Sequence, residues 1–342
     1  MNGMLARHVG DYHFLADAKS GMTFRWGKTL DDNPTFAPVP ELADISISNR
    51  CSKGCDFCYK DSTPDGKVMS VEEYCQVLDS MNSPEYGNVF QVAIGGGEPL
   101  EHPDFLQIVE ETAKRGIVMN FTTNGQKLNA EICAALKRKV GAMAISASSI
   151  SDLKEIIPAI TCAEGLKVNI HYILSKKSIE EATKIVKGVY NDLLKGINAI
   201  VFLTYKPAGR GTTDLALKDG EGIKSFIEVV KAPKTICKIG FDACFVPMLM
   251  SGKAVRNEMV DVCEGGLFSV YIDENMNVSP CSFSGGKDAY SLNEYGFYDI
   301  WLNKLQDYRE RVKNECKIDC AVRELCRGCC AYYPQITSCY QR

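Results

Sequence analysis

One rhythm runs through the chain from about residue 43 to 245, where short apolar runs alternate with longer amphipathic segments. This alternation is typical of βαβ units, whose strands pair in parallel. The expected strands are 43–48, 89–96, 116–123, 142–148, 167–174, 199–205 and 235–243, and the clearest helices are 70–82, 102–115 and 175–194. We therefore predict an α/β fold, a partial parallel (β/α)6 barrel similar to a TIM barrel.

The segments on either side of this repeat have a different character. Residues 8–27 form two alternating runs around a Lys-Ser-Gly turn, which predicts a β-hairpin cap. The C-terminal part is rich in cysteine and contains a turn-linked strand pair at 268–283 and a helix at 297–312. The predicted domains are a cap (1–42), a barrel (43–245) and a cysteine-rich domain (246–342).

Charge and hydropathy limit the classes of partner. The formal net charge is −4, and no run of Lys and Arg is interleaved with aromatic residues, so we expect no binding to nucleic acid. The N-terminus lacks the apolar core of a signal peptide, and no stretch approaches the ~20 apolar residues of a membrane span. We expect a cytoplasmic protein, away from the membrane, whose sixteen cysteines serve metal or iron-sulfur ligation rather than disulfides.

The first chemical motif is a loop with three cysteines, Cys51, Cys55 and Cys58, directly after the first barrel strand. Three thiolates at this spacing can bind three irons of a cubane cluster and leave the fourth iron open for a ligand. A closed zinc site needs four ligands, so a zinc knuckle would have to borrow a fourth cysteine from elsewhere. A disulfide-exchange motif fits less well, because it uses a pair of cysteines at the start of a helix.

The second motif is Gly-Gly-Gly-Glu-Pro at residues 95–99, where the second strand ends. Three glycines allow backbone groups to approach a ligand without hindrance from side chains, and Pro99 ends the strand by removing a hydrogen-bond donor. A glycine-rich turn without a ligand is the alternative. The position of this motif, one strand after the three cysteines, is what gives it weight.

Together the two motifs resemble the radical S-adenosylmethionine (SAM) superfamily over about residues 40 to 245. The resemblance implies an enzyme in which Cys51, Cys55 and Cys58 hold a 4Fe-4S cluster. That cluster would cleave SAM reductively to a 5'-deoxyadenosyl radical, which abstracts a hydrogen atom from the substrate. It also implies cofactor contacts from Phe57 and Tyr59 near the cluster or adenine, and from Gly96, Gly97 and Glu98 along the methionine amino group.

Further polar residues stand at the ends of later strands. The resemblance implies contacts with the methionine or ribose from Thr123, Asn124, Ser146 and Ser148, although each could equally cap the following helix. Asn169 and His171 have inward parity on the fifth strand, and for His171 we favour a hydrogen-bonded core histidine. Tyr205, Lys206 and Arg210 follow the sixth strand and either meet the SAM carboxylate or the substrate, or form a solvated loop.

Nine cysteines lie in the C-terminal part of the chain, from residue 244 to 339, enough for two cubane clusters with one to spare. They resemble the SPASM domain, which carries two auxiliary 4Fe-4S clusters. The resemblance assigns Cys244, Cys263, Cys281 and Cys330 to the first cluster and Cys316, Cys320, Cys326 and Cys339 to the second. Cys329 could exchange roles with Cys330, and a pair of zinc sites or a single cluster are the alternatives. Four other cysteines are read as small buried hydrophobic residues: Cys75, Cys133, Cys162 and Cys237.

Enzymes with a SPASM domain mostly act on peptides or proteins. We therefore predict a maturase that cross-links or oxidises side chains of a ribosomally made peptide. A leader segment would bind to the N-terminal hairpin or to a separate protein, and a flavodoxin or ferredoxin would supply electrons. The alternatives are a small-molecule substrate or a non-enzymatic iron-sulfur or zinc protein. The sequence names no catalytic base, and Cys329 is the one surplus C-terminal thiol that we nominate as a hydrogen donor.

Overall fold

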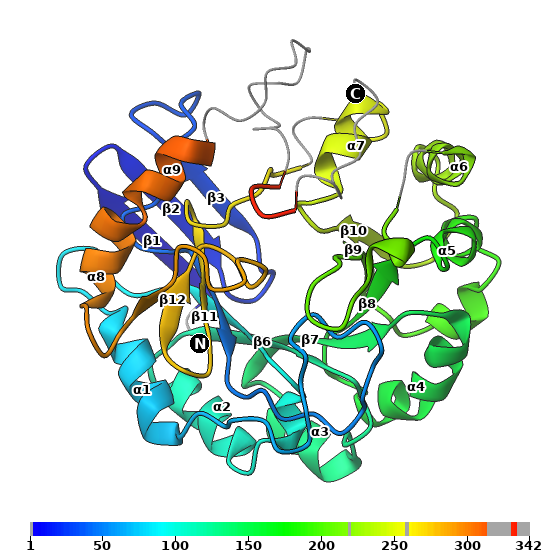
Figure 1. Cartoon of the computed structure of the whole chain (residues 1–342), viewed down its shortest axis with the longest axis horizontal. Helices are drawn as coiled ribbons and strands as arrows, with labels where there is room; N and C mark the ends of the chain where they lie inside the picture. The colour runs from blue at the N-terminus through cyan, green and yellow to red at the C-terminus, as the bar shows by residue number, and fades with distance from the viewer. Residues whose placement is uncertain (1–2, 218–219, 257–259, 313–329, 334–342) are drawn as a thin grey trace.

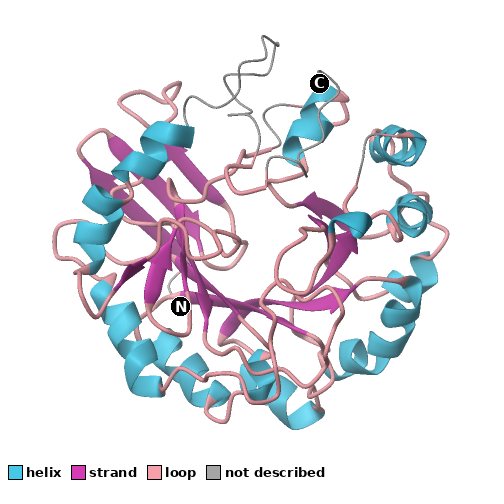
Figure 2. Ribbon diagram, in the orientation of Figure 1, coloured by secondary structure: helices cyan, strands magenta, loops and turns pink. Residues whose placement is uncertain are grey.

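The computed structural model describes residues 3–217, 220–256, 260–312 and 330–333. Most strands of this part form one ten-stranded sheet in the order β10-β9-β8-β7-β6-β5-β4-β11-β12-β13. The sheet curves into a partial barrel, and helices α1 to α6 lie around its outer side (Figures 1 and 2). Along the run from β4 to β10, chain neighbours are also sheet neighbours, and every pair is parallel. The predicted partial parallel barrel is therefore confirmed.

All seven expected barrel strands are present. They are β4 (Leu42–Ser46), β5 (Gln91–Gly95), β6 (Val118–Thr123), β7 (Val140–Ala147), β8 (Val168–Leu174), β9 (Ala199–Thr204) and β10 (Lys238–Phe241). Since the parallel strands end at the same edge of the sheet, the loops that carry the two motifs meet there. The parallel run from β4 to β10 has seven strands, one more than the six of the predicted (β/α)6 barrel.

The helices that cover the barrel are α1 (Val71–Ser80), α2 (Phe105–Lys114), α3 (Ala130–Leu136), α4 (Ile150–Cys162), α5 (Ile179–Val186) and α6 (Glu221–Val230). A capping box between Ser70 and Glu73 fixes the start of α1. The single helix expected at 175–194 is wrong: α5 ends at Val186, and a separate turn follows at Asn191–Leu194. Gly188 has φ +79°, and an added side chain there would press on the Lys234 carbonyl, so the helix stops.

The N-terminal cap is a separate antiparallel sheet of three strands, β1 (Met4–Val9), β2 (Tyr12–Asp17) and β3 (Thr23–Trp26). The predicted hairpin corresponds to β2 and β3. The additional strand β1 joins β2 through a turn in which Gly10 has φ +56°. Most side chains of β1 are exposed, so it lacks the apolar alternation by which a strand is recognised in a sequence.

The C-terminal part extends the barrel sheet. The expected strand pair is β11 (Ser269–Ile272) and β12 (Asn277–Ser279), followed by β13 (Tyr290–Ser291). Strand β11 pairs in parallel with β4, so this hairpin lies directly beside the first barrel strand. The helix expected at 297–312 is built from α8 (Phe297–Asp299), a π-helical turn (Ile300–Lys304) and α9 (Gln306–Val312), and α7 (Val246–Ser251) precedes the hairpin.

The two faces of the barrel sheet differ in character. The helix-facing positions, such as Ile45, Ile94, Phe121 and Ile145, are almost fully buried in the main hydrophobic core. The alternate positions face the barrel interior and are small or polar and only partly buried: Asp44, Ala93, Asn120, Thr122, Ala142, Ser146, Asn169 and His171. An ordinary TIM barrel fills its interior with bulky branched side chains. Here the interior face keeps space for a ligand.

Among the described residues, no helix has the length and apolar character needed to cross a membrane.

Candidate active site

The three-cysteine loop connects β4 to α1 at the carboxyl edge of the sheet. Cys51, Cys55 and Cys58 are all partly exposed. Backbone hydrogen bonds shape the loop, from the Cys51 amide to the Thr63 carbonyl (2.9 Å) and from the Cys58 amide to the Cys55 carbonyl (3.2 Å). In the part of the chain that the structure describes, no group of three His, Cys, Asp or Glu side chains is arranged to hold a single metal ion. The donor set, three thiols on one accessible loop, is that of a cubane with an open iron.

The glycines of the second motif pack against the backbone of the cysteine loop. The Gly97 amide donates to the Ser48 carbonyl (2.6 Å) and the Glu98 amide to the Arg50 carbonyl (2.8 Å). An added side chain at Gly96 would collide with the Ser48 carbonyl, and one at Gly97 with the Arg50 carbonyl. These two glycines therefore bring the two motif loops into backbone contact, a role that the sequence analysis did not anticipate.

Glu98 ties the glycine loop to the end of β6. Its buried carboxylate accepts hydrogen bonds from Thr123 Oγ1 (2.6 Å), the Asn124 amide (2.6 Å) and the Leu100 amide (3.1 Å). Burial outweighs these bonds and raises the pKa of Glu98. The side-chain nitrogen of Asn124 is buried and has no hydrogen-bond partner among the described residues. A free donor beside both motifs is the kind of group that a polar cofactor would satisfy.

The serines at the end of β7 differ from each other. Ser146 is half-buried and pairs in register with His171 across β7 and β8. Ser148 donates from its amide (2.6 Å) and hydroxyl (2.7 Å) to Asp152, so it serves the start of α4. His171 lies 3.3 Å from Thr122 Oγ1, and burial lowers its pKa to about 4, which keeps it neutral near pH 7. His171 therefore lies on the half-buried inner face of the sheet, whereas we had favoured a position in the hydrophobic core.

Arg210 holds the cysteine loop from the far side of the barrel. Its Nε donates to the Cys55 carbonyl, and its Nη1 donates to the Ser62 carbonyl and to Asp61, each at 2.9 Å. The Arg210 amide also donates to the Cys58 carbonyl (3.0 Å). Among the described residues, every hydrogen bond of this side chain goes to the loop that carries the cysteines, so its observed role is to shape that loop.

The aromatic residues of the loop point to different partners. Phe57 packs with Tyr205 and Ala216 in a small buried cluster. Tyr59 contacts Phe283 beyond the C-terminal hairpin, with ring centroids 4.7 Å apart, and burial raises the pKa of its hydroxyl well above the usual range.

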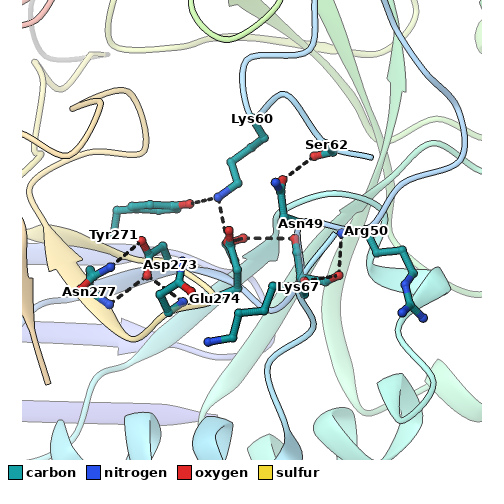
Figure 3. Close-up of polar contacts among 12 residues, drawn as sticks. Asn49, Arg50, Lys60, Ser62, Lys67, Tyr271, Asp273, Glu274 and Asn277 are labelled. Carbon is teal, nitrogen blue, oxygen red and sulfur yellow. Dashed lines mark hydrogen bonds and ion pairs between the residues drawn. The ribbon is translucent and has the colours of Figure 1, made fainter. Parts of the chain in front are cut away.

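Lys60, the next residue, makes a buried ion pair that the sequence analysis missed. Its Nζ lies 2.8 Å from Glu274 Oε2 and donates to the Tyr271 hydroxyl at 2.9 Å (Figure 3). Ser46 of β4 donates to the same carboxylate oxygen at 2.6 Å. Burial alone would raise the pKa of Glu274, but the bonds from Lys60 and Ser46 outweigh it and lower that pKa. The network joins the cysteine loop, the first barrel strand and the C-terminal hairpin.

The structure also brings together the four cysteines expected to hold the first auxiliary cluster. The thiols of Cys244 and Cys330 are hydrogen-bonded to each other, and Cys281 interacts electrostatically with Cys263 and Cys330. Burial raises the pKa of Cys281 to about 12. The second expected set lies outside the described residues, as does Cys329: Cys316, Cys320, Cys326 and Cys339.

Lys206 places a buried positive charge beside this group of cysteines. Burial alone would lower its pKa, but the Asp242 carboxylate 2.7 Å away outweighs burial and raises it. The ammonium group also lies 4.5 Å from the centre of the Phe283 ring. Lys206 and Tyr205 are both buried, which rules out the solvated loop for these two residues.

Comparison with known proteins identifies the class. The family model described as the radical SAM superfamily matches residues 45–199, the part of the chain that holds both motifs. This part of the chain therefore carries a radical SAM domain, and the chain is an enzyme, as the two motifs predicted.

The similar proteins cover most of the chain. The mycofactocin maturase MftC of Mycobacterium tuberculosis is 22% identical, over 85% of this chain and 78% of its own length. The AdoMet-dependent heme synthase of Methanosarcina barkeri is 25% identical, over 85% and 91%. The crystal structure of SuiB from Streptococcus suis bound to S-adenosylmethionine has a TM-score of 0.73 at 15% identity, covering 96% and 95%. SuiB was also solved bound to its precursor peptide SuiA, with the same TM-score.

Proposed function

We propose that this enzyme is a maturase that modifies a ribosomally made peptide or protein by cross-linking or oxidising its side chains. The observation that carries the proposal is the backbone contact between the cysteine loop and the glycine loop, above a barrel interior lined by small and polar residues. The resemblance to a maturase and to a protein solved with its precursor peptide supports a peptide substrate.

In this proposal Cys51, Cys55 and Cys58 hold the 4Fe-4S cluster. The cofactor-binding residues are Phe57, Tyr59, Gly96, Gly97, Glu98, Thr123, Asn124, Ser146, Ser148 and Arg210. When bound, the cluster and SAM supply radical chemistry that abstracts a hydrogen atom from the substrate. The chain fixes the geometry: Gly96 and Gly97 set the separation of the two loops, and Glu98 holds the backbone of Asn124, whose side-chain nitrogen has no partner among the described residues.

The auxiliary clusters form the finer part of the proposal. Cys244, Cys263, Cys281 and Cys330 already lie near one another, which supports their common role, and Lys206 would offset the negative charge of their thiolates. Cys316, Cys320, Cys326 and Cys339 complete the second set. A flavodoxin or ferredoxin would supply electrons, a separate protein could present the leader peptide, and the cytoplasm is the compartment that keeps these thiols reduced.

A small-molecule substrate is the second candidate, because a heme synthase is among the similar proteins. The discriminating assay offers the reconstituted enzyme precursor peptides encoded beside its gene and follows their mass. Loss of hydrogen from a peptide supports a maturase, whereas SAM turnover that responds only to small molecules contradicts it.

The core chemistry is tested on anaerobically reconstituted protein by measuring iron, sulfide and 5'-deoxyadenosine. We expect about twelve irons per chain for three cubanes. Changing Cys51, Cys55 and Cys58 to Ala should remove about four irons and all 5'-deoxyadenosine. The matched control is C75A/C162A, two cysteines on the outer helices, which should keep both. Deoxyadenosine production by the triple variant would refute the assignment of the cluster loop.

A further inference from the structure

Asp44 is a carboxylate in the wall of the barrel interior that the proposed cofactor site does not use. It lies in the middle of β4, in register with Tyr271 of β11 and Ala93 of β5. Its chain neighbours Ala43 and Ile45 are fully buried in the helix-facing core, so strand alternation turns Asp44 toward the interior. The side chain stays partly exposed on that side, and Oδ1 lies 4.0 Å from the position of a Cβ on Gly95.

This carboxylate has no hydrogen-bond donor among the residues that the structure describes. The cation whose charge acts on it is Lys60, which already donates to Glu274 and Tyr271. Burial raises the pKa of Asp44 to about 7, and the charge of Lys60 only partly opposes this. The second buried lysine, Lys206, is paired with Asp242. Glu274 and Asp242 each pair with a buried lysine, whereas Asp44 has no such partner among the described residues.

A carboxylate that is largely removed from water and has no protein donor costs free energy, which is why such groups are usually paired. A ligand that brings a positively charged donor would remove this cost through a charge-assisted hydrogen bond. The neighbouring positions Ala93 and Gly95 carry little or no side chain, so they leave room for such a ligand beside the carboxylate.

We propose that Asp44 is a substrate-binding residue that accepts a hydrogen bond from a basic side chain, the ammonium of lysine or the guanidinium of arginine, in the substrate peptide. The inference rests on the proposed function, because it takes the barrel interior as the place where the peptide is held. It adds a specificity that neither motif contains: a basic residue near the position that is modified.

The test measures binding to the reconstituted holoenzyme by anaerobic calorimetry, with SAM present. The probes are acetylated, amidated tripeptides, Gly-X-Gly, in which X is lysine, arginine, norleucine or glutamate. The variants are Asp44→Asn, which keeps the shape and removes the charge, and Asp44→Ala, which removes both. Asp79→Asn is the matched control, because Asp79 is an exposed acid on α1 that pairs with Arg115 outside the barrel.

We expect the wild type and Asp79→Asn to bind the lysine or arginine probe about tenfold more tightly than the norleucine probe. Both Asp44 variants should bring this preference below about twofold. An equal preference in Asp44→Asn and wild type, or no preference in wild type, would overturn the inference.

SAM itself carries an ammonium and a sulfonium group, so its affinity is measured on the same variants. The inference requires an unchanged affinity for SAM. A loss confined to SAM would show that Asp44 faces the cofactor instead, which also overturns it.

These binding readouts do not require SAM cleavage. If deoxyadenosine production depends on the three cysteines but the lysine preference is absent, only the role of Asp44 fails. If the cysteine test itself fails, the proposed function fails whatever the probes do.

Discussion

The buried ion pair between Lys60 and Glu274 yields a sharp prediction about stability. The two side chains retain only 12% and 8% of their exposure, and their charged atoms are 2.8 Å apart. Removing one partner of a buried pair leaves an uncompensated charge, which typically costs about 3–5 kcal/mol. We therefore expect Lys60→Met to lower the free energy of unfolding by that amount, because Glu274 would lose its cation and keep only neutral hydrogen bonds, such as the one from Ser46.

The double variant separates this cost from the value of the pair itself. In Lys60→Met/Glu274→Gln no charge is left unpaired, so we expect it to recover at least about 2 kcal/mol relative to Lys60→Met. The assay is anaerobic urea unfolding of the reconstituted protein with a check that the m-value is unchanged. The control is Arg115→Met, which breaks more exposed pairs with Asp79 and Glu111 and should cost about 1 kcal/mol or less.

Two outcomes would refute this reasoning. The first is that Lys60→Met lowers the free energy of unfolding by less than about 1 kcal/mol. The second is that the loss in the double variant equals the sum of the losses in the two single variants. The pH dependence gives a further check, because the pKa of Glu274 is lowered from its ordinary value of 4.5. Stability from this carboxylate is fully present above pH about 4.5 and is lost as the pH falls through the lowered pKa.

Three further predictions concern other parts of the site. Gly97→Ala should destabilise the protein by at least about 2 kcal/mol, since its Cβ would strike a carbonyl, whereas Gly222→Ala on α6 should stay within about 1 kcal/mol in the same unfolding assay. Arg210→Ala should lose iron to a chelator faster than wild type. Arg210→Lys should lose it at an intermediate rate, because an ammonium lacks the planar, forked donors of a guanidinium. Equal rates in all three proteins would contradict the role of Arg210 in shaping the cysteine loop. Asp44→Asn should match wild type in stability near pH 4 and exceed it by up to about 4 kcal/mol above pH 8. The reason is that the pKa of Asp44 is raised to about 7, so ionisation of its carboxylate opposes folding. A stability difference that does not grow with pH would contradict this.

Much of this protein can be predicted from local patterns. Each barrel strand is an apolar run bounded by turn residues, and each covering helix repeats apolar positions at helical spacing, so both appear in the sequence without reference to distant residues. The spacing of Cys51, Cys55 and Cys58 and the glycines at 95–97 are likewise local. For that reason the fold class and the superfamily could be predicted before the structure.

Other features depend on contacts between residues far apart in the chain. Lys60 and Glu274 are ordinary charged residues in the sequence, and they become a buried pair only because β11 adds to the sheet beside β4. Strand alternation turns Asp44 toward the interior, but its lack of a donor there depends on which side chains the fold brings near it. The approach of the two motif loops likewise decides that Gly97 must lack a side chain.

A pattern of hydrophobic residues specifies which elements form and which face of each is buried. The partner of a buried charge depends on strand order and register, which only the tertiary structure decides.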